Sequence, residues 1–166
     1  MNLDLTSLYK SINSLDRAIN VYEKESISND KNSDLMQTLS AGVIQNFEFT
    51  YELCWKFMKR WLDENIGSTV ADGVTRRELF RLSAENKLIN DVDKWMEFHR
   101  SRNLTSHTYD EKTADEVLAY AIKFVIYAKD FLKNFDLCGW KSKQLLQAWK
   151  KVVNEFAAID PYRYSA

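Results

Sequence analysis

Apolar side chains recur every three or four residues along most of this chain, which is the spacing of one face of an α-helix. The first run predicts a helix with one apolar stripe, formed by Leu8, Ile12, Leu15, Ile19 and Tyr22. The polar stretch 26–32 interrupts the pattern, and Ser33 is of a residue type that caps helix N-termini. A second helix is therefore predicted to begin directly after Ser33.

The second predicted helix is long, from about Asp34 to Glu64, and it has apolar residues on two sides. One stripe consists of Leu35, Leu39, Ile44, Phe47, Tyr51, Trp55, Met58 and Leu62, and the other of Phe49, Leu53, Phe57 and Trp61. A helix that is covered from two sides is either the central helix of a bundle or also contacts a partner chain.

A polar line runs between these stripes, formed by Gln45, Glu48, Glu52, Lys56 and Lys59. Glu48, Glu52 and Lys56 are successive i,i+4 neighbours on the helix surface. Their spacing favours a solvated stripe with ion pairs worth about 0.3 kcal/mol each. The alternative is a row of binding groups that lines a cleft.

Three more helices follow along the chain. Two capping boxes, Thr75–Glu78 and Thr113–Glu116, predict the starts of a short helix and a long one, and Asn90 or Asp91 begins a helix between them. The residues expected to face inward are Leu79, Leu82 and Leu88 in the first, Val92, Trp95, Met96 and Phe98 in the second, and Val117, Ala121, Phe124, Ala128, Phe131 and Phe135 in the third.

Glycine and proline are scarce, with 4 and 1 among 166 residues. Sheets and their turns use more of both, and no strand pattern is visible. The chain is therefore predicted to be all-α, an antiparallel up-down helical bundle of four to five core helices plus a C-terminal helix. The length favours one domain, with the bundle in residues 1–136 and an extension in residues 137–166 packed on it.

The extension, residues 137–166, holds five basic side chains against two acidic ones, together with several aromatic residues. Gly139 is expected to end the preceding helix and Ser142 to start the last one. This composition is typical of a lid, an interface helix or an RNA contact. The simpler interpretation, one more amphipathic helix that covers the bundle, is favoured.

The net charge of −1 gives the chain no overall basic field, so any contact with nucleic acid has to be local. Cys54 and Cys138 lie in apolar helical surroundings, and we interpret both as small buried hydrophobic residues. No signal-peptide pattern opens the chain, and no uncharged apolar stretch reaches the ~20 residues that span a bilayer. We expect a cytoplasmic protein that does not enter a membrane.

The segment 100–110 concentrates the chemistry, since it holds a guanidinium, an amide, an imidazole and a phenol. Arg102 and His107 would point ~140° apart on one unbroken helix. They can converge only if the helix ends or deforms between them, or if a second subunit supplies one of them. Arg100 is seven residues from His107 and would share its face. A composite site across a two-fold dimer is therefore plausible.

These residue types suit phosphate-ester chemistry without a metal or another cofactor. Neutral His107 could accept a proton from a ribose 2′-hydroxyl, and its imidazolium could donate one to the leaving oxygen. Arg102 would bind the non-bridging phosphate oxygens, and Asn103 could orient a phosphate or the imidazole. The Tyr109 hydroxyl, in a polar segment, could accept a nucleotidyl group. The plainer interpretation is a polar helix end with a solvated arginine.

Two motifs carry a resemblance to a known family. The pattern Arg102-x4-His107-x-Tyr109 resembles that of the HEPN superfamily. The segments 42–56 and 102–110 are similar to signatures of one branch of it, the nucleotidyltransferase substrate-binding protein family. Together with the helix order, the resemblance covers about residues 5–135.

This resemblance implies a helical bundle that forms a homodimer and binds a minimal nucleotidyltransferase. Members with an intact motif resemble toxins of toxin–antitoxin pairs, which are metal-independent endoribonucleases with RNA as substrate. By position, Arg102 and His107 would be catalytic and Asn103 supporting. The nucleotidyltransferase, as antitoxin, would attach AMP to Tyr109. The alternative that the resemblance leaves open is a non-catalytic nucleotide-binding or substrate-binding subunit of a two-component nucleotidyltransferase. Arg100, Gln45, Glu48, Glu52 and Lys56 are further expected binding residues.

Overall fold

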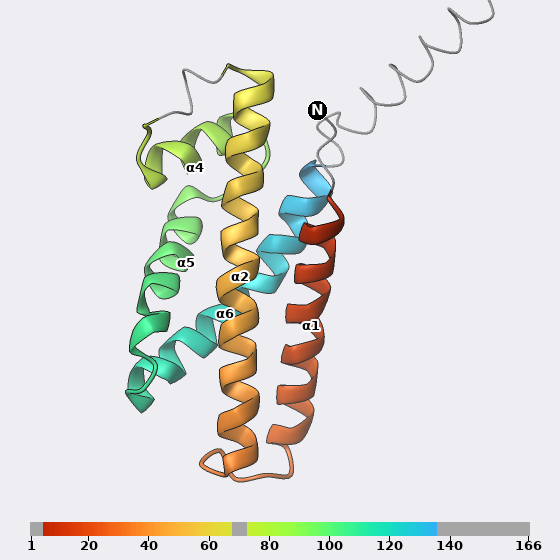
Figure 1. Ribbon diagram of the computed structural model, residues 1–166, viewed down its shortest axis with the longest axis vertical. Coiled ribbons are helices and arrows are strands. Elements are labelled where there is room, and N and C mark those ends of the chain that lie inside the picture. The colour runs from red at the N-terminus through yellow and green to blue at the C-terminus, as the bar shows by residue number, and fades with distance from the viewer. Residues whose placement is uncertain (1–4, 68–72, 136–166) are drawn as a thin grey trace, which may run out of the picture.

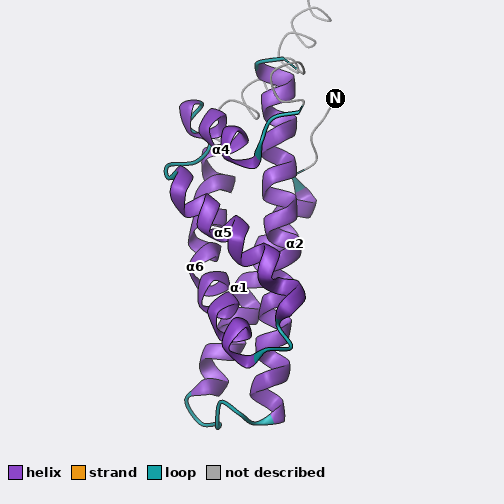
Figure 2. Ribbon diagram, turned by 90° about the vertical axis from the view of Figure 1, so that its left-hand side faces the viewer, coloured by secondary structure: helices purple, strands orange, loops and turns teal. Residues whose placement is uncertain are grey.

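The computed structural model describes residues 5–67 and 73–135. These residues form five α-helices and one turn of 3₁₀ helix. Their bounds are α1 Thr6–Ser26, α2 Asp34–Asn65, α4 Arg76–Glu85, α5 Val92–Leu104, η1 Thr105–His107 and α6 Glu111–Phe135 (Figure 1). In the described part every regular element is helical, as Figure 2 shows. The all-α class and the helical bundle are confirmed.

Helix α2 is the central element, because it packs against α1, α4, α5 and α6. In Figure 1, α1 and α5 run in the opposite direction to α2, on either side of it, while α6 crosses behind. This arrangement confirms the central position that the two apolar stripes of α2 predict. The stripes are wrong at two places: Leu35 and Phe49 are 46% and 41% exposed, and Met36 is buried in place of Leu35.

The core is rich in aromatic side chains where α2, α4, α5 and α6 meet. The ring of Phe124 on α6 lies between Phe47 of α2 and Phe98 of α5, at centroid distances of 5.2 and 5.1 Å. Trp95 on α5 is 1% exposed, and its ring contacts those of Phe80, Phe98, Phe124 and Phe131. This cluster fixes α5 against α6 and thereby positions the end of α5, which carries the predicted site.

Side chains cap the N-termini of three helices at predicted residues: Ser33 accepts from Met36 N, Thr75 from Glu78 N and Asp91 from Lys94 N. The predicted cap of the long helix at Thr113 is wrong. Helix α6 begins at Glu111, and the carboxylate of Asp110 accepts both the backbone N–H and the hydroxyl of Thr113. An aspartate caps at least as well as a threonine, so the helix starts at the earlier residue.

The last predicted elements lie outside the described residues. They are Gly139, Ser142, Cys138 and the extension 137–166, so the division at residue 136 stays a prediction. Cys54 is buried, as expected, and burial raises the pKa of its thiol. None of the helices in the described ranges is long and apolar enough to cross a membrane.

Candidate functional site

The end of α5 is built by hydroxyl side chains. Thr105, Ser106 and Thr108 each donate their hydroxyl to the backbone carbonyl three residues earlier, at 2.8, 3.4 and 3.1 Å. These bonds satisfy carbonyls that the last turn of a helix leaves without partners. The α-helix therefore tightens to the 3₁₀ turn Thr105–His107. The helix thus ends between Arg102 and His107, which is one of the conditions that the sequence sets for their convergence.

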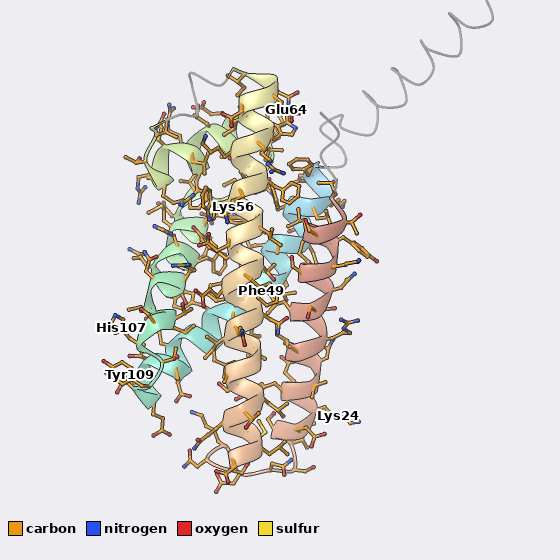
Figure 3. All side chains as sticks on the ribbon, in the orientation of Figure 1. Lys24, Phe49, Lys56, Glu64, His107 and Tyr109 are labelled. Carbon is orange, nitrogen blue, oxygen red and sulfur yellow. The ribbon has the colours of Figure 1, made fainter. Side chains whose placement is uncertain are left out.

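His107 and Tyr109 lie on the short connection between α5 and α6. Both are exposed, Tyr109 at 88%, and their rings meet edge-to-face at a centroid distance of 6.2 Å. Figure 3 shows both side chains at the outer edge of the molecule. Tyr109 also lines a pocket with residues of α2, among them Gln37 and Ile44. The connection is fixed at its far side, since Asp110 N–H donates to the carbonyl of His107 and its carboxylate caps α6. The expected exposure of the Tyr109 hydroxyl is confirmed.

Arg102 points toward α2 and lies beside two carboxylates. Its Nε is 2.8 Å from Oε1 of Glu52, and one terminal nitrogen is 3.4 Å from Oε1 of Glu48. The Nε–H has no partner at hydrogen-bond geometry, so the closer contact is an ion pair rather than a directed bond. The other oxygen of Glu52 accepts a hydrogen bond from the indole N–H of Trp55 at 2.9 Å. Glu52 therefore links Arg102 to Trp55.

The predicted polar line of α2 is thus divided. Glu48 and Glu52 are half-buried against the arginine of α5, whereas Gln45 and Lys56 are exposed. Among the described residues no ion pair joins Glu52 to Lys56, because Glu52 is drawn to Arg102 instead. The modest ion pairing that the spacing predicts is present, but the partner of these two glutamates is Arg102 of α5 and not a neighbour on α2.

Arg102 and His107 do not meet within one chain. In the ranges that the structure describes, no hydrogen bond or ion pair joins them, and none joins Arg100 or Asn103 to His107. Arg100 and Asn103 are exposed. The contribution of a second subunit remains a prediction. Nor does the described part of the chain hold a group of three or more His, Cys, Asp and Glu side chains that could bind a metal ion.

His99, the other histidine, is a residue that the motif does not indicate. Its Nδ1 lies 3.0 Å from the hydroxyl of Tyr51, and the two rings stack at 5.9 Å. Burial raises the pKa of the Tyr51 phenol, which therefore keeps its proton. Burial also lowers the pKa of His99, and the positive charges of Arg76 and Arg102 lower it further. His99 is therefore neutral near pH 7, and the positive charges of both arginines disfavour its protonation.

Arg76, at the start of α4, is the second residue that the sequence does not single out. Its guanidinium lies over the indole ring of Trp55, 3.7 Å from the centroid. Such stacking is favourable because the face of the indole is negative. The only local signal is its place directly after the Thr75 cap. Its spatial neighbours, Trp55 and His99, come from two other helices, so the sequence alone cannot group them.

The comparison with known proteins identifies the family. A family model described as nucleotidyltransferase substrate binding protein like matches residues 3–136. The chain belongs to this family. It is 39% identical over 103 residues to a protein of Haemophilus influenzae named probable ribonuclease HepT, covering 61% of this chain and 70% of that one.

Two solved structures are similar. HI0074 of Haemophilus influenzae, described as revealing the fold of a substrate binding domain of a nucleotidyltransferase, is 33% identical with a TM-score of 0.72. The match covers 78% of this chain and 97% of that one. A crystal structure of a protein from Thermus thermophilus is 24% identical with a TM-score of 0.54, and the match covers 72% and 96% of the two chains. The latter supports the fold alone.

Proposed function

We propose that this protein is a metal-independent endoribonuclease of the toxin type, neutralised by a minimal nucleotidyltransferase. The observation that carries the proposal is the 39% identity to probable ribonuclease HepT. The arrangement at the end of α5 supports it, because His107 and Tyr109 are open to solvent and Arg102 lies in the last α-helical turn before the 3₁₀ segment.

The reaction needs a base, an acid and a cation. In a two-fold dimer, one His107 takes the proton of a ribose 2′-hydroxyl, and the 2′-oxygen attacks the adjacent phosphorus. The bond from phosphorus to the 5′-oxygen breaks, and the His107 of the second subunit, as imidazolium, protonates that oxygen. The products are a 2′,3′-cyclic phosphate and a free 5′-hydroxyl. Arg102 binds the non-bridging oxygens as charge develops on them, and Asn103 supports their orientation.

The partner acts on Tyr109. The phenol oxygen attacks the α-phosphorus of ATP, a phosphodiester to AMP forms, pyrophosphate leaves, and the phenol proton passes to solvent or a base of the partner. The attached phosphate places negative charge beside His107 and competes with RNA for Arg102. Modification is therefore expected to stop cleavage.

The cleavage test compares the purified protein with His107→Ala and Arg102→Ala on a labelled RNA in the presence of EDTA. We expect both variants to lose cleavage by at least a hundredfold. The control is Arg77→Ala, which removes an arginine that is 62% exposed and paired with Asp93 of α5. The proposed mechanism also requires that the cleavage products carry a 2′,3′-cyclic phosphate. Equal cleavage by the wild type and both variants would refute the assigned residues.

The modification test is co-expression with the nucleotidyltransferase followed by intact-mass measurement. We expect a mass increase of one or more AMP units that is absent in Tyr109→Phe and retained in Tyr9→Phe, since Tyr9 is another exposed tyrosine at 58%. If the complex forms without added mass, the proposed modification is refuted, whereas the proposed partner is retained.

One observation favours a second candidate function, a non-catalytic substrate-binding subunit. Arg102 lies in ion pairs with Glu48 and Glu52, so its charge is already compensated. HI0074 is itself described as a substrate binding domain of a nucleotidyltransferase. This candidate predicts that the wild type cleaves no RNA, while the complex with the partner binds a nucleoside triphosphate more tightly than the partner alone.

A further inference from the structure

A pocket of about 240 Å³ lies where α2, α4 and α5 meet. The described residues that line it are Trp55, Lys59, Gly73, Val74, Thr75, Arg76, Leu79 and His99. It is separate from the exposed connection of His107 and Tyr109, which belongs to the proposed cleavage site. Three of the lining side chains carry cationic or imidazole nitrogen donors, and each of these comes from a different helix.

Arg76 is held in place without an ion pair to any described residue. Its guanidinium is stacked on Trp55, which fixes the plane of the group without neutralising it. Its Nε is buried and has no hydrogen-bond partner. Among the described residues no carboxylate pairs with Arg76, in contrast to Arg102, which lies beside Glu48 and Glu52. A buried cationic donor without a partner is costly unless a ligand satisfies it.

The tautomer of His99 supplies a second donor. The hydroxyl of Tyr51 is buried and protonated, and its partner is Nδ1 of His99 at 3.0 Å. Among the described residues this nitrogen is the one partner of the hydroxyl, so we assign the phenol as the donor and Nδ1 as the acceptor. The proton of the neutral imidazole is then on Nε2, on the opposite side of the ring from Tyr51. His99 lines the pocket, so Nε2–H is the donor that it can present there.

The charges around the pocket are mixed: Glu52 accepts from Trp55 behind the lining, whereas the charged side chains in the lining itself are positive. Lys59 lies in the lining, is paired with Asp63 at 3.6 Å and adds a positive charge to this side of the pocket. The described lining contains no carboxylate. Thr75 is the N-cap of α4 and Arg76 its first residue, and the N-terminus of the helix adds a partial positive charge. Guanidinium, imidazole and ammonium groups thus line a volume that is large enough to admit a phosphate group.

We propose that this pocket binds a phosphate group of an RNA strand, with Arg76 as the principal ligand, His99 Nε2–H as a second donor and Lys59 as a flanking charge. The stacked arginine offers its donors in a fixed plane, which matches phosphate oxygens. Arg102 follows His99 by three residues on α5, so it lies about one helical turn from the pocket. A strand bound at Arg102 can place a neighbouring phosphate at Arg76. The inference rests on the proposed ribonuclease function, to which the pocket adds a binding position without taking part in the cleavage chemistry.

The experiment is a titration of the full chain followed through its histidine side chains by NMR. The chain has two histidines, so the His99 and His107 signals are assigned by comparison with His107→Ala. The probes are a 2′-O-methyl oligonucleotide, which cannot be cleaved, ATP, and inorganic phosphate. We expect the oligonucleotide to shift the His99 signals in wild type and equally in His107→Ala. Binding by the inactive variant separates this proposal from the proposed cleavage.

The variants are Arg76→Gln and its matched control Arg77→Gln, on the adjacent exposed residue. Loss of a charged hydrogen bond predicts a roughly tenfold to hundredfold weaker affinity of Arg76→Gln for the oligonucleotide and no change in Arg77→Gln. For Lys59→Gln, measured by the same titration, we expect a smaller loss of affinity for the oligonucleotide. This substitution leaves the stacking of Arg76 on Trp55 in place. Unshifted His99 signals with every probe would overturn the proposal. A response to ATP without one to the oligonucleotide would overturn the RNA assignment.

Discussion

The pair Tyr51 and His99 gives the sharpest test of the structure, through the substitution Tyr51→Phe. The Tyr51 side chain is 0% exposed, and its hydroxyl has one partner, Nδ1 of His99 at 3.0 Å. Phenylalanine keeps the ring and its contacts with Phe47 and Phe124, at 6.3 and 6.1 Å, and removes the oxygen alone. The substitution therefore isolates one hydrogen bond without opening a cavity large enough for water.

The expected loss of stability depends on the hydrogen bond that is removed and on the acceptor, Nδ1 of His99, that loses its partner. A net hydrogen bond contributes about 0.5–1.5 kcal/mol, and an abandoned acceptor costs ~1–3 kcal/mol when it is fully buried. His99 is only half-buried, so water can reach its ring and most of that second cost is avoided. We expect Tyr51→Phe to lose about 1 kcal/mol of unfolding free energy, or roughly 2–4 °C in Tm for a chain of this size.

Two measurements decide the outcome. Chemical denaturation gives the free energy, with Tyr9→Phe as the control for an exposed tyrosine. Nitrogen-15 spectra of the imidazoles give the tautomer, which we expect to be Nε2–H for His99 in the wild type and a mixture in Tyr51→Phe. A wild-type His99 protonated at Nδ1 would refute the donor assignment. A stability loss above about 3 kcal/mol would show that the hydroxyl supports more than this one bond.

Three further predictions concern the cap, the core and pH. Asp110→Ala is expected to cost about 1 kcal/mol because α6 loses its N-cap, whereas Thr113→Val, which keeps the capped N–H, is expected to cost less in the same denaturation assay. Trp95→Ala, at a 1% exposed position among four aromatic rings, is expected to cost about 3–5 kcal/mol, against less than about 1 kcal/mol for Phe49→Ala at 41% exposure. Burial and neighbouring guanidinium groups hold the pKa of His99 below its ordinary value of 6.5, so the unfolded chain binds its proton first. Stability is then full above pH 6.5 and falls as the pH drops below it, and His99→Gln should flatten that slope in denaturation series between about pH 7 and 5.5.

Most of the fold follows from periodicity and caps. The buried faces of α1 and α6 follow three- and four-residue spacing, and Ser33, Thr75 and Asp91 cap their helices as predicted. The capping-box pattern misplaces the start of α6 because two neighbouring residues, Asp110 and Thr113, can both cap. Local pattern cannot choose between them, since the choice depends on how the chain leaves the preceding 3₁₀ turn.

The site is predictable only as far as it is local in sequence. The motif at the end of α5 indicates His107 and Tyr109, and both side chains are exposed. The carboxylates beside Arg102 come from α2, which is distant in the sequence. Spacing along α2 predicts an i,i+4 partner for Glu52 and cannot predict that its partner is an arginine of α5. His99 escapes sequence reasoning because a histidine on an amphipathic helix has no distinguishing pattern. Only the packing of α2, α4 and α5 brings it beside Tyr51 and Arg76.

In the proposed ribonuclease, the two carboxylates beside Arg102 would influence how an RNA phosphate binds to it. The side chains of Arg102, Glu48 and Glu52 are 32%, 41% and 27% exposed, so the contacts are screened, and such pairs contribute about 0–1 kcal/mol. The glutamates therefore orient the guanidinium without locking it, and a phosphate can replace them at small cost. Their negative charge still disfavours an approaching strand, whereas the described lining of the Arg76 pocket has no carboxylate. A strand is then expected to engage Arg76 first, and the phosphate so anchored brings its neighbour to Arg102 at high effective concentration.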